Sequence, residues 1–202
     1  MQAAKDGYCG YVPEAALGAA RAPTHRVIAP ATHLYPQPKV QAHELCGLSF
    51  GSLLTVTGTA ERFAETPDGF VPHQHLRAVD DPLPDPVAVA SLFLGTPYLW
   101  GGNGRAGIDC SGLVQAALLA CGKDCPGDSD LQAHTVGQAL QPDDALLPGD
   151  LIFWAGHVAM VADAGRIIHA TGHRMAVVFE DMAEAIARIA ATGQPVLALR
   201  RP

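Results

Sequence analysis

The sequence has no long apolar run and few positively charged residues. Its 202 residues include 13 Lys and Arg against 20 Asp and Glu, which gives a formal net charge of −7. No uninterrupted apolar stretch reaches the ~18 residues that span a bilayer, so no transmembrane segment or membrane partner is predicted. No segment is rich in Lys and Arg, which argues against a nucleic-acid-binding protein.

The cysteines are too few and too scattered for a disulfide framework or a metal site. Five cysteines are spread along the chain, an odd number that favours a reducing compartment. Cys121 and Cys125 have a spacing that zinc tolerates, and His134 follows, but no second pair completes four ligands. We therefore expect no metal and no cofactor. The N-terminus lacks the apolar core of a signal peptide, which favours a cytoplasmic location.

Turn residues and prolines divide the chain into two main regions. Short strand-like runs separated by turn residues occupy residues 23–78 and predict a small all-β barrel. The Pro- and Asp-rich residues 79–85 predict a linker to a catalytic domain over residues 86–202.

Two helices of the second region have clear start signals. Asp85 is the expected N-cap of a helix with Pro86 as its first residue and an end at Gly95. A last helix is expected near Asp181, with Glu184 completing a pair that resembles a capping box. Its apolar face predicts packing on the catalytic sheet.

One cysteine stands where a reactive thiol is expected. Residues 97–112 read PYLWGGNGRAGIDCSG and lead into a helical apolar pattern, which places Cys110 in the first turn of a helix with Asp109 as N-cap. Unpaired N–H groups at a helix N-terminus favour the thiolate, so we expect the pKa of Cys110 to be lowered toward neutrality. The same N–H groups can hold an oxyanion. An isolated cysteine is more often a small buried hydrophobe, so this interpretation needs partner residues.

Two histidines supply those partners. His157 begins the strand-like run HVAMVAD and His169 ends RIIHA, on either side of a turn signal at residues 163–166. A hairpin brings them close, but a two-residue loop at Ala164 and Gly165 would place them on opposite faces. A bulge or an odd-length loop is therefore required. Together with Cys110 they provide a nucleophile, a base and an orienting group.

These motifs and their order resemble the NlpC-type peptidases, papain-like cysteine enzymes that cut bacterial cell-wall peptides. PYLWGG, DCSGLV, DSDLQ, LPGDLIFW, HVAMV and IHA stand in the family's order, and the resemblance covers about residues 86–202. It implies an α+β papain-like domain, with an antiparallel sheet packed on helices and the nucleophile at a helix N-terminus, preceded by an SH3-like barrel. It also implies Cys110 as nucleophile, His157 as base and His169 as the residue that orients the imidazole.

The resemblance further implies a substrate cleft lined by Tyr98, Asp109, Ser111, Asp128 and Ser129. Each of these residues also has a structural interpretation. Asp109 can simply cap its helix, Tyr98 can cover an edge of the core, and Ser129 with Gln132 can form a capping box before AHTVGQAL.

A short repeat suggests that an N-terminal segment is missing. Residues 10–17, GYVPEAAL, match residues 69–76, GFVPHQHL, at Gly, Val, Pro and Leu. Both look like the closing strand of a bacterial SH3-like domain, so residues 1–22 are interpreted as the C-terminal remnant of a first such domain. Short repeats also arise by chance in alanine-rich sequence, and a missing segment would remove any targeting signal.

The expected function is hydrolysis of a γ-D-glutamyl bond through an acyl-enzyme. The resemblance implies that this bond joins γ-D-glutamate to meso-diaminopimelate or L-lysine in a peptidoglycan stem peptide or muropeptide. It further suggests murein peptide recycling by release of L-Ala-γ-D-Glu, with Tyr11 or Glu14 near the free L-alanine. Two alternatives stay open: a wall-peptide-binding module with an inactive or secondary catalytic domain, and a thiol amidase or acyltransferase. The sequence does not set the oligomeric state.

Overall fold

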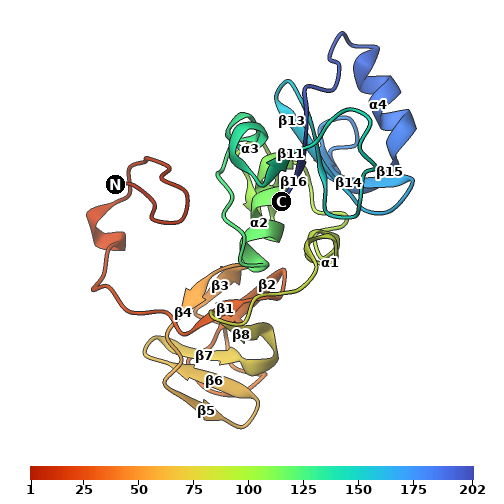
Figure 1. Ribbon diagram of the computed structural model, residues 1–202. Coiled ribbons are helices and arrows are strands. Elements are labelled where there is room, and N and C mark those ends of the chain that lie inside the picture. The colour runs from red at the N-terminus through yellow and green to blue at the C-terminus, as the bar shows by residue number, and fades with distance from the viewer. The chain divides into compact units, whose positions relative to one another are not determined.

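The computed structural model describes residues 1–202, which divide into two compact units. The smaller unit contains Met1 and residues 9–82, and the larger contains residues 2–8 and 83–202. In Figure 1 the strands of the smaller unit are orange to yellow, and the helices and sheet of the larger unit are yellow-green to blue. None of the helices combines the length and the apolar character that crossing a membrane requires.

The smaller unit consists of short antiparallel strands, as the sequence predicted. Its core is formed by one buried side chain from each of β1, β2, β6, β7 and β8, namely Val27, Leu34, Ala64, Val71 and Leu76. The first sheet has the order β4 (Leu53–Leu54), β1 (His25–Val27) and β8 (Leu76–Ala78). β2 (Ala31–Leu34) pairs with β3 (Cys46–Ser49), and β6 (Phe63–Thr66) lies between β5 (Gly58–Ala60) and β7 (Gly69–Pro72). Two 3-10 turns, η1 (Glu14–Ala16) and η2 (His73–His75), complete the unit.

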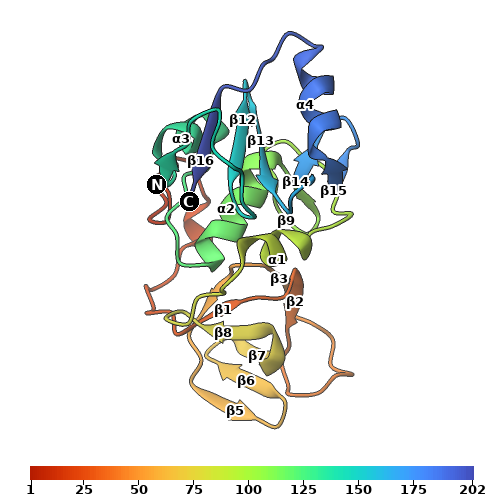
Figure 2. The same ribbon diagram turned by 45° about the vertical axis from the view of Figure 1, so that its right-hand side comes forward.

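The larger unit is built on a six-stranded antiparallel sheet, which is seen beside its helices in Figure 2. The strand order is β11 (Gln138–Ala139), β16 (Ala198–Arg201), β12 (Leu151–Trp154), β13 (His157–Val161), β14 (Arg166–Thr171) and β15 (Ala176–Asp181). A short hairpin of β9 (Asn103–Gly104) and β10 (Gly107–Ile108) precedes helix α2 (Cys110–Ala120). The other helices are α1 (Pro86–Ser91), α3 (Ser129–Thr135) and α4 (Met182–Ala190).

Two helices fix the sheet that carries the site. Helix α2 is almost entirely buried and packs against β13 and β14, so it is anchored in the core along its length. Helix α4 packs its Ala185 and Ile189 against Ala159, Val161 and neighbouring sheet residues. Because side chains alternate along a strand, His157 lies on the same face of β13 as Ala159 and Val161. The α+β class and the packing of the last helix are as predicted.

Helix boundaries follow the predicted caps, with one correction. Asp85 Oδ1 accepts hydrogen bonds from the N–H groups of Val87 (2.8 Å) and Ala88 (3.2 Å), which confirms it as the N-cap. The helix ends at Ser91 rather than at Gly95, because Gly95 turns away with φ +75° and donates to the Val177 carbonyl on β15 at 2.9 Å.

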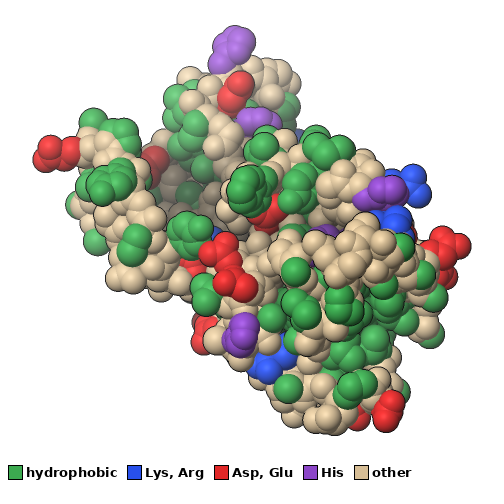
Figure 3. Space-filling model, turned by 90° about the horizontal axis from the view of Figure 1, so that it is seen from above, with side chains coloured by type: hydrophobic (Ala, Val, Ile, Leu, Met, Phe, Trp, Pro, Cys, Tyr) green, Lys and Arg blue, Asp and Glu red, His purple; other side chains and the backbone are tan.

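The surface carries no continuous basic area on the face drawn in Figure 3, where acidic and basic side chains are scattered among apolar ones. This distribution agrees with the net charge of −7.

Candidate active site

The site is assembled at the N-terminus of α2, where Asp109 holds three groups at once. Its Oδ1 accepts hydrogen bonds from Gly112 N–H (2.7 Å) and the Ser111 hydroxyl (3.1 Å), and its Oδ2 accepts one from Gly101 N–H (2.8 Å). Asp109 is therefore the predicted N-cap, and it also ties the glycine-rich loop to the helix. A Cβ on Gly112 would lie 2.6 Å from the Gly102 carbonyl oxygen, so this close approach requires glycine.

Cys110 occupies the first turn of α2, as predicted, but its thiol is not acidic. Burial raises the pKa of Cys110, and the charge of Asp109 raises it further. Hydrogen bonds from backbone N–H groups, with that of Val158 the largest, lower the pKa by less. The expectation of a pKa lowered toward neutrality is therefore wrong, because the thiol is 6% exposed and the helix N-terminus is capped by a carboxylate.

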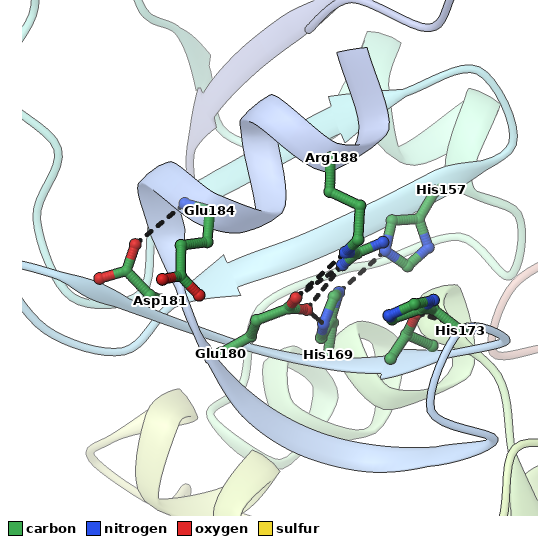
Figure 4. Close-up of polar contacts among 8 residues, drawn as sticks. His157, His169, His173, Glu180, Asp181, Glu184 and Arg188 are labelled. Atoms are coloured by element: carbon green, nitrogen blue, oxygen red, sulfur yellow. Dashed lines mark hydrogen bonds and ion pairs between the residues drawn. The ribbon is translucent and has the colours of Figure 1, made fainter. Parts of the chain in front are cut away.

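The two predicted histidines lie side by side on the β13–β14 hairpin. Met160 pairs with Ile168 and Val161 with Ile167, so residues 162–166, of which Arg166 already belongs to β14, separate the last paired positions. This odd-length loop meets the requirement derived from the sequence, and both histidines occupy one face. His157 Nε2 lies 2.9 Å from His169 Nδ1 (Figure 4).

Cys110 lies close to β13, the strand that carries His157. The backbone N–H of Val158, which directly follows His157, acts to lower the pKa of the Cys110 thiol. No hydrogen bond joins the thiol to the His157 ring in the structure. Catalytic hydrogen bonds commonly tighten only when substrate is bound.

Glu180 and Arg188 extend the histidine pair, and the sequence analysis missed both. His169 Nε2 lies 2.9 Å from Glu180 Oε2, and Arg188 Nη2 donates to both Glu180 oxygens at 2.7 and 2.8 Å. The His169 side chain is completely buried. Glu180 and Arg188 come from β15 and α4, and the only signal in the sequence is an acidic residue near the end of a strand that is otherwise apolar.

Burial and neighbouring charges keep both histidines neutral. Burial is the main cause that lowers the pKa of His157 to about 3, helped by His169 and Arg188 and opposed by Glu180. Burial also lowers the pKa of His169, against the attraction of Glu180. Burial acts to raise the pKa of Glu180, but Arg188 and His169 outweigh it and hold the pKa below its ordinary value. Burial thus favours neutral forms of the thiol and of both imidazoles, beside an ionised Glu180.

Acidic residues line a cavity of about 270 Å³ beside the α2 N-terminus. Asp109 and Asp128 contribute to it, together with Asp6 from the segment 2–8. Asp6 accepts hydrogen bonds from Gln115 Nε2 (3.0 Å) and Tyr8 N–H (3.1 Å). Burial acts to raise the pKa of Asp6, but these bonds and Lys5 hold it below its ordinary value. No sequence motif indicated Asp6, which lies 109 residues from Gln115 along the chain.

The remaining predicted cleft residues differ in their surroundings. Burial raises the pKa of Tyr98, as do the charges of Cys110 and Asp109, so the phenol lies near the nucleophile. Ser111 is buried and donates to Asp109. Ser129 is the first residue of α3 and is half-buried. Tyr11, suggested near the L-alanine, is fully exposed, and Glu14 belongs with it to the smaller unit.

The capping box expected at Ser129 and Gln132 does not form. Asp128 is the N-cap of α3 and makes no side-chain cap bond. The buried Gln132 amide instead donates to the carbonyl groups of Ser111 (3.0 Å) and Pro126 (2.9 Å). Gln132 thus holds the first turn of α2, and the helix ends at Thr135 instead of continuing through AHTVGQAL.

The cysteine pair considered for zinc belongs to no metal-binding cluster. No group of three or more His, Cys, Asp or Glu side chains has a suitable arrangement in the structure. Cys125 is buried, and burial raises the pKa of its thiol to about 12.

Alkylation of Cys110 is expected to be slow at neutral pH and to accelerate as the pH rises. The raised pKa keeps the thiolate scarce at pH 7, and only the thiolate reacts with iodoacetamide. The measurement is peptide mapping by mass spectrometry after timed labelling between about pH 6 and pH 10, with the exposed Cys46 as internal reference. Rapid labelling of Cys110 at pH 7 would instead show a preformed thiolate–imidazolium pair.

Comparisons with known proteins agree with this geometry. The model of the NlpC/P60 family matches residues 95–193. A γ-D-glutamyl-L-lysine dipeptidyl-peptidase of Bacillus subtilis (strain 168) is 32% identical over 117 residues, which cover 54% of this chain and 38% of that protein. The chain thus spans well under half the length of that relative.

Two crystal structures extend the comparison. An NlpC/P60 family protein from Bacillus cereus ATCC 10987 is 26% identical with a TM-score of 0.74, over 89% of this chain and 63% of that chain. The NlpC/p60 domain of the peptidoglycan hydrolase SagA is 30% identical with a TM-score of 0.48, over 58% of this chain and 96% of that chain. With the α+β sheet, the Cys110 helix and the histidine hairpin in place, the chain belongs to the NlpC/P60 family.

Proposed function

We propose that the chain is a cysteine peptidase that hydrolyses the bond between γ-D-glutamate and a diamino acid in peptides derived from peptidoglycan. The observation that carries the proposal is the buried Cys110 at the start of α2, close to the strand β13 whose His157 is hydrogen-bonded to His169. The similarity to the Bacillus subtilis γ-D-glutamyl-L-lysine dipeptidyl-peptidase supports the same substrate class.

The proposed reaction begins from neutral groups. His157 removes the thiol proton as the Cys110 sulfur attacks the γ-glutamyl carbonyl carbon, which avoids a buried thiolate in the free protein. N–H groups at the start of α2 stabilise the oxyanion of the tetrahedral intermediate. The imidazolium then protonates the departing amine of the diamino acid, and the thioester remains on Cys110. Water, deprotonated by His157, hydrolyses the thioester and releases the γ-glutamyl product.

The acidic cavity supports a preference for a free amino terminus. Three carboxylates, those of Asp6, Asp109 and Asp128, line it, and Lys5 is the basic residue among them, with its Nζ 3.8 Å from Asp6. A primary ammonium group is the ligand that several carboxylates favour. We therefore propose that the cavity takes the L-alanine ammonium of L-Ala-γ-D-Glu-diamino acid peptides, an activity of the kind used in murein peptide recycling.

Release of L-Ala-D-Glu from L-Ala-γ-D-Glu-meso-diaminopimelate, and from its L-lysine analogue, is the expected result. Mass spectrometry of the products identifies the bond cleaved, and N-acetylated peptides measured in parallel test the free amine. Asp128→Asn is expected to raise KM for the free-amine peptides about tenfold while kcat changes little, since it removes one charged contact.

Asp130→Asn is the matched control, because Asp130 is also exposed on the first turn of α3 but does not line the cavity. Equal cleavage of free and N-acetylated peptides would contradict the amine proposal and indicate an endopeptidase. Binding of peptide without any product would indicate a binding module, and transfer to an added amine in place of hydrolysis would indicate a transferase.

A further inference from the structure

We propose that Glu180, held by Arg188, is a positioning residue that sets the tautomers of both histidines and so makes Nδ1 the basic nitrogen of His157. The proposal extends to catalysis only if the proposed function holds, but the tautomers themselves are independent of any substrate. Neither Glu180 nor Arg188 was indicated by the sequence motifs.

The hydrogen-bond chain admits one arrangement of protons. Arg188 donates to both oxygens of Glu180, and an ionised carboxylate can only accept, so His169 Nε2 must carry the hydrogen across the 2.9 Å contact. A neutral His169 then has a bare Nδ1, which accepts from His157 Nε2–H at 2.9 Å. A neutral His157 with hydrogen on Nε2 leaves Nδ1 bare. That nitrogen is the one free to take a thiol proton.

The surroundings of the hydrogen-bonded residues keep each ring nitrogen as a donor or an acceptor. Figure 4 shows His157 on β13, His169 on β14 and Glu180 on β15 joined by hydrogen bonds, with Arg188 reaching in from α4 to bind Glu180. The side chain of His169 is completely buried, and that of Glu180 is 12% exposed, so water competes little for their hydrogen bonds. Trp154 packs against the His157 ring, with centroids 5.6 Å apart. The backbone elements therefore hold the rings in a single orientation.

Other ionisable groups near the pair do not supply an alternative acceptor for His169. His173 acts on His169 through its charge alone and lowers its pKa. His173 and Arg188 line a cavity of about 350 Å³ that His157 also borders, and no carboxylate lines this cavity. Glu180 is the one carboxylate that accepts a hydrogen bond from the pair.

Glu180→Gln is expected to reverse both tautomers. Arg188 would take the amide oxygen, so the amide nitrogen would face His169 Nε2, and two donors cannot share a hydrogen bond. His169 would then carry its hydrogen on Nδ1, and His157 would have to accept at Nε2 and carry its hydrogen on Nδ1. His157 Nδ1 could then no longer accept the thiol proton, so kcat is expected to fall about 10²- to 10⁴-fold with little change in KM.

Tautomers are read directly by long-range ¹H–¹⁵N NMR of protein labelled with ¹⁵N-histidine, because protonated and bare ring nitrogens have distinct shifts. Signals are assigned through His157→Gln and His169→Gln. The expected wild-type result is hydrogen on Nε2 of both rings, and the reversed pattern in Glu180→Gln. Arg188→Lys keeps a cation on Glu180 and is expected to retain the wild-type tautomers.

Glu184→Gln is the matched control, because Glu184 is an exposed carboxylate on the same helix as Arg188 and makes no contact with the histidines. Hydrogen on Nδ1 of His169 in the wild-type protein would overturn the proposal. So would wild-type tautomers in a folded Glu180→Gln protein, where folding is checked by thermal melting. If the wild-type protein cleaves no peptide, the proposed function fails, whereas the NMR result still decides the role of Glu180.

Discussion

Cys110→Ala is expected to reduce dipeptide release by about four orders of magnitude or more, the largest effect of any single substitution in the chain. The proposed reaction passes through a thioester on this sulfur, and alanine offers no nucleophile. The Asp109 cap and the backbone of α2 remain intact, so substrate binding is expected to persist. Initial rates by mass spectrometry and peptide affinity by calorimetry measure the two quantities separately.

Cys121→Ala is the control at the opposite end of the same helix, where Cys121 is half-buried at the C-cap. It is expected to leave kcat and KM near their wild-type values. Retention of more than about one-hundredth of the wild-type rate in Cys110→Ala would rule out nucleophilic catalysis by this residue.

Asp109→Ala is expected to lower the free energy of unfolding of the larger unit by about 2 to 4 kcal/mol, combining the loss of an N-cap with donors left unsatisfied in a buried place. Gly112 N–H, Gly101 N–H and the Ser111 hydroxyl would all lose their acceptor. Activity should fall further than stability explains, because the glycine-rich loop is no longer tied to the turn that carries Cys110.

Asp109→Asn distinguishes the hydrogen bonds accepted by Asp109 Oδ1 from the one accepted by Oδ2. The amide oxygen can still accept from Gly112 N–H, whereas the amide nitrogen would face Gly101 N–H, so about half of the destabilisation is expected. Urea unfolding followed by circular dichroism gives the free energies. A loss below about 0.5 kcal/mol in Asp109→Ala would show that the cap does not hold the helix.

Local signals in the sequence predicted the parts of the site that lie within one turn or one hairpin. The caps at Asp85, Asp109 and Asp181 follow from short-range hydrogen bonds, and Asp181 indeed accepts from Glu184 N–H at 2.9 Å. The odd-length loop that places His157 and His169 on one face also follows from the alternation of side chains.

Local sequence signals could not predict contacts between side chains that only the folded structure brings together. Arg188 meets Glu180 only because α4 folds back over the sheet. Gln132 donates to the carbonyl groups of Ser111 on α2 and Pro126 instead of capping its own helix. The pKa of Cys110 depends on burial, which no local motif records. Residues 86–202 as a catalytic domain and residues 1–22 as a remnant remain predictions.

The membership of residues 2–8 in the larger unit has a consequence for the order in which the chain folds. These residues are synthesised before the rest of the larger unit, and the Asp6 carboxylate accepts a hydrogen bond from Gln115, 109 residues later. Residues 9–82 can become compact before residues 2–8 make their contact with Gln115. Closing so long a loop carries an entropic cost that only the finished α2 surface can offset. Residues 2–8 are thus expected to dock on the larger unit only after α2 has formed.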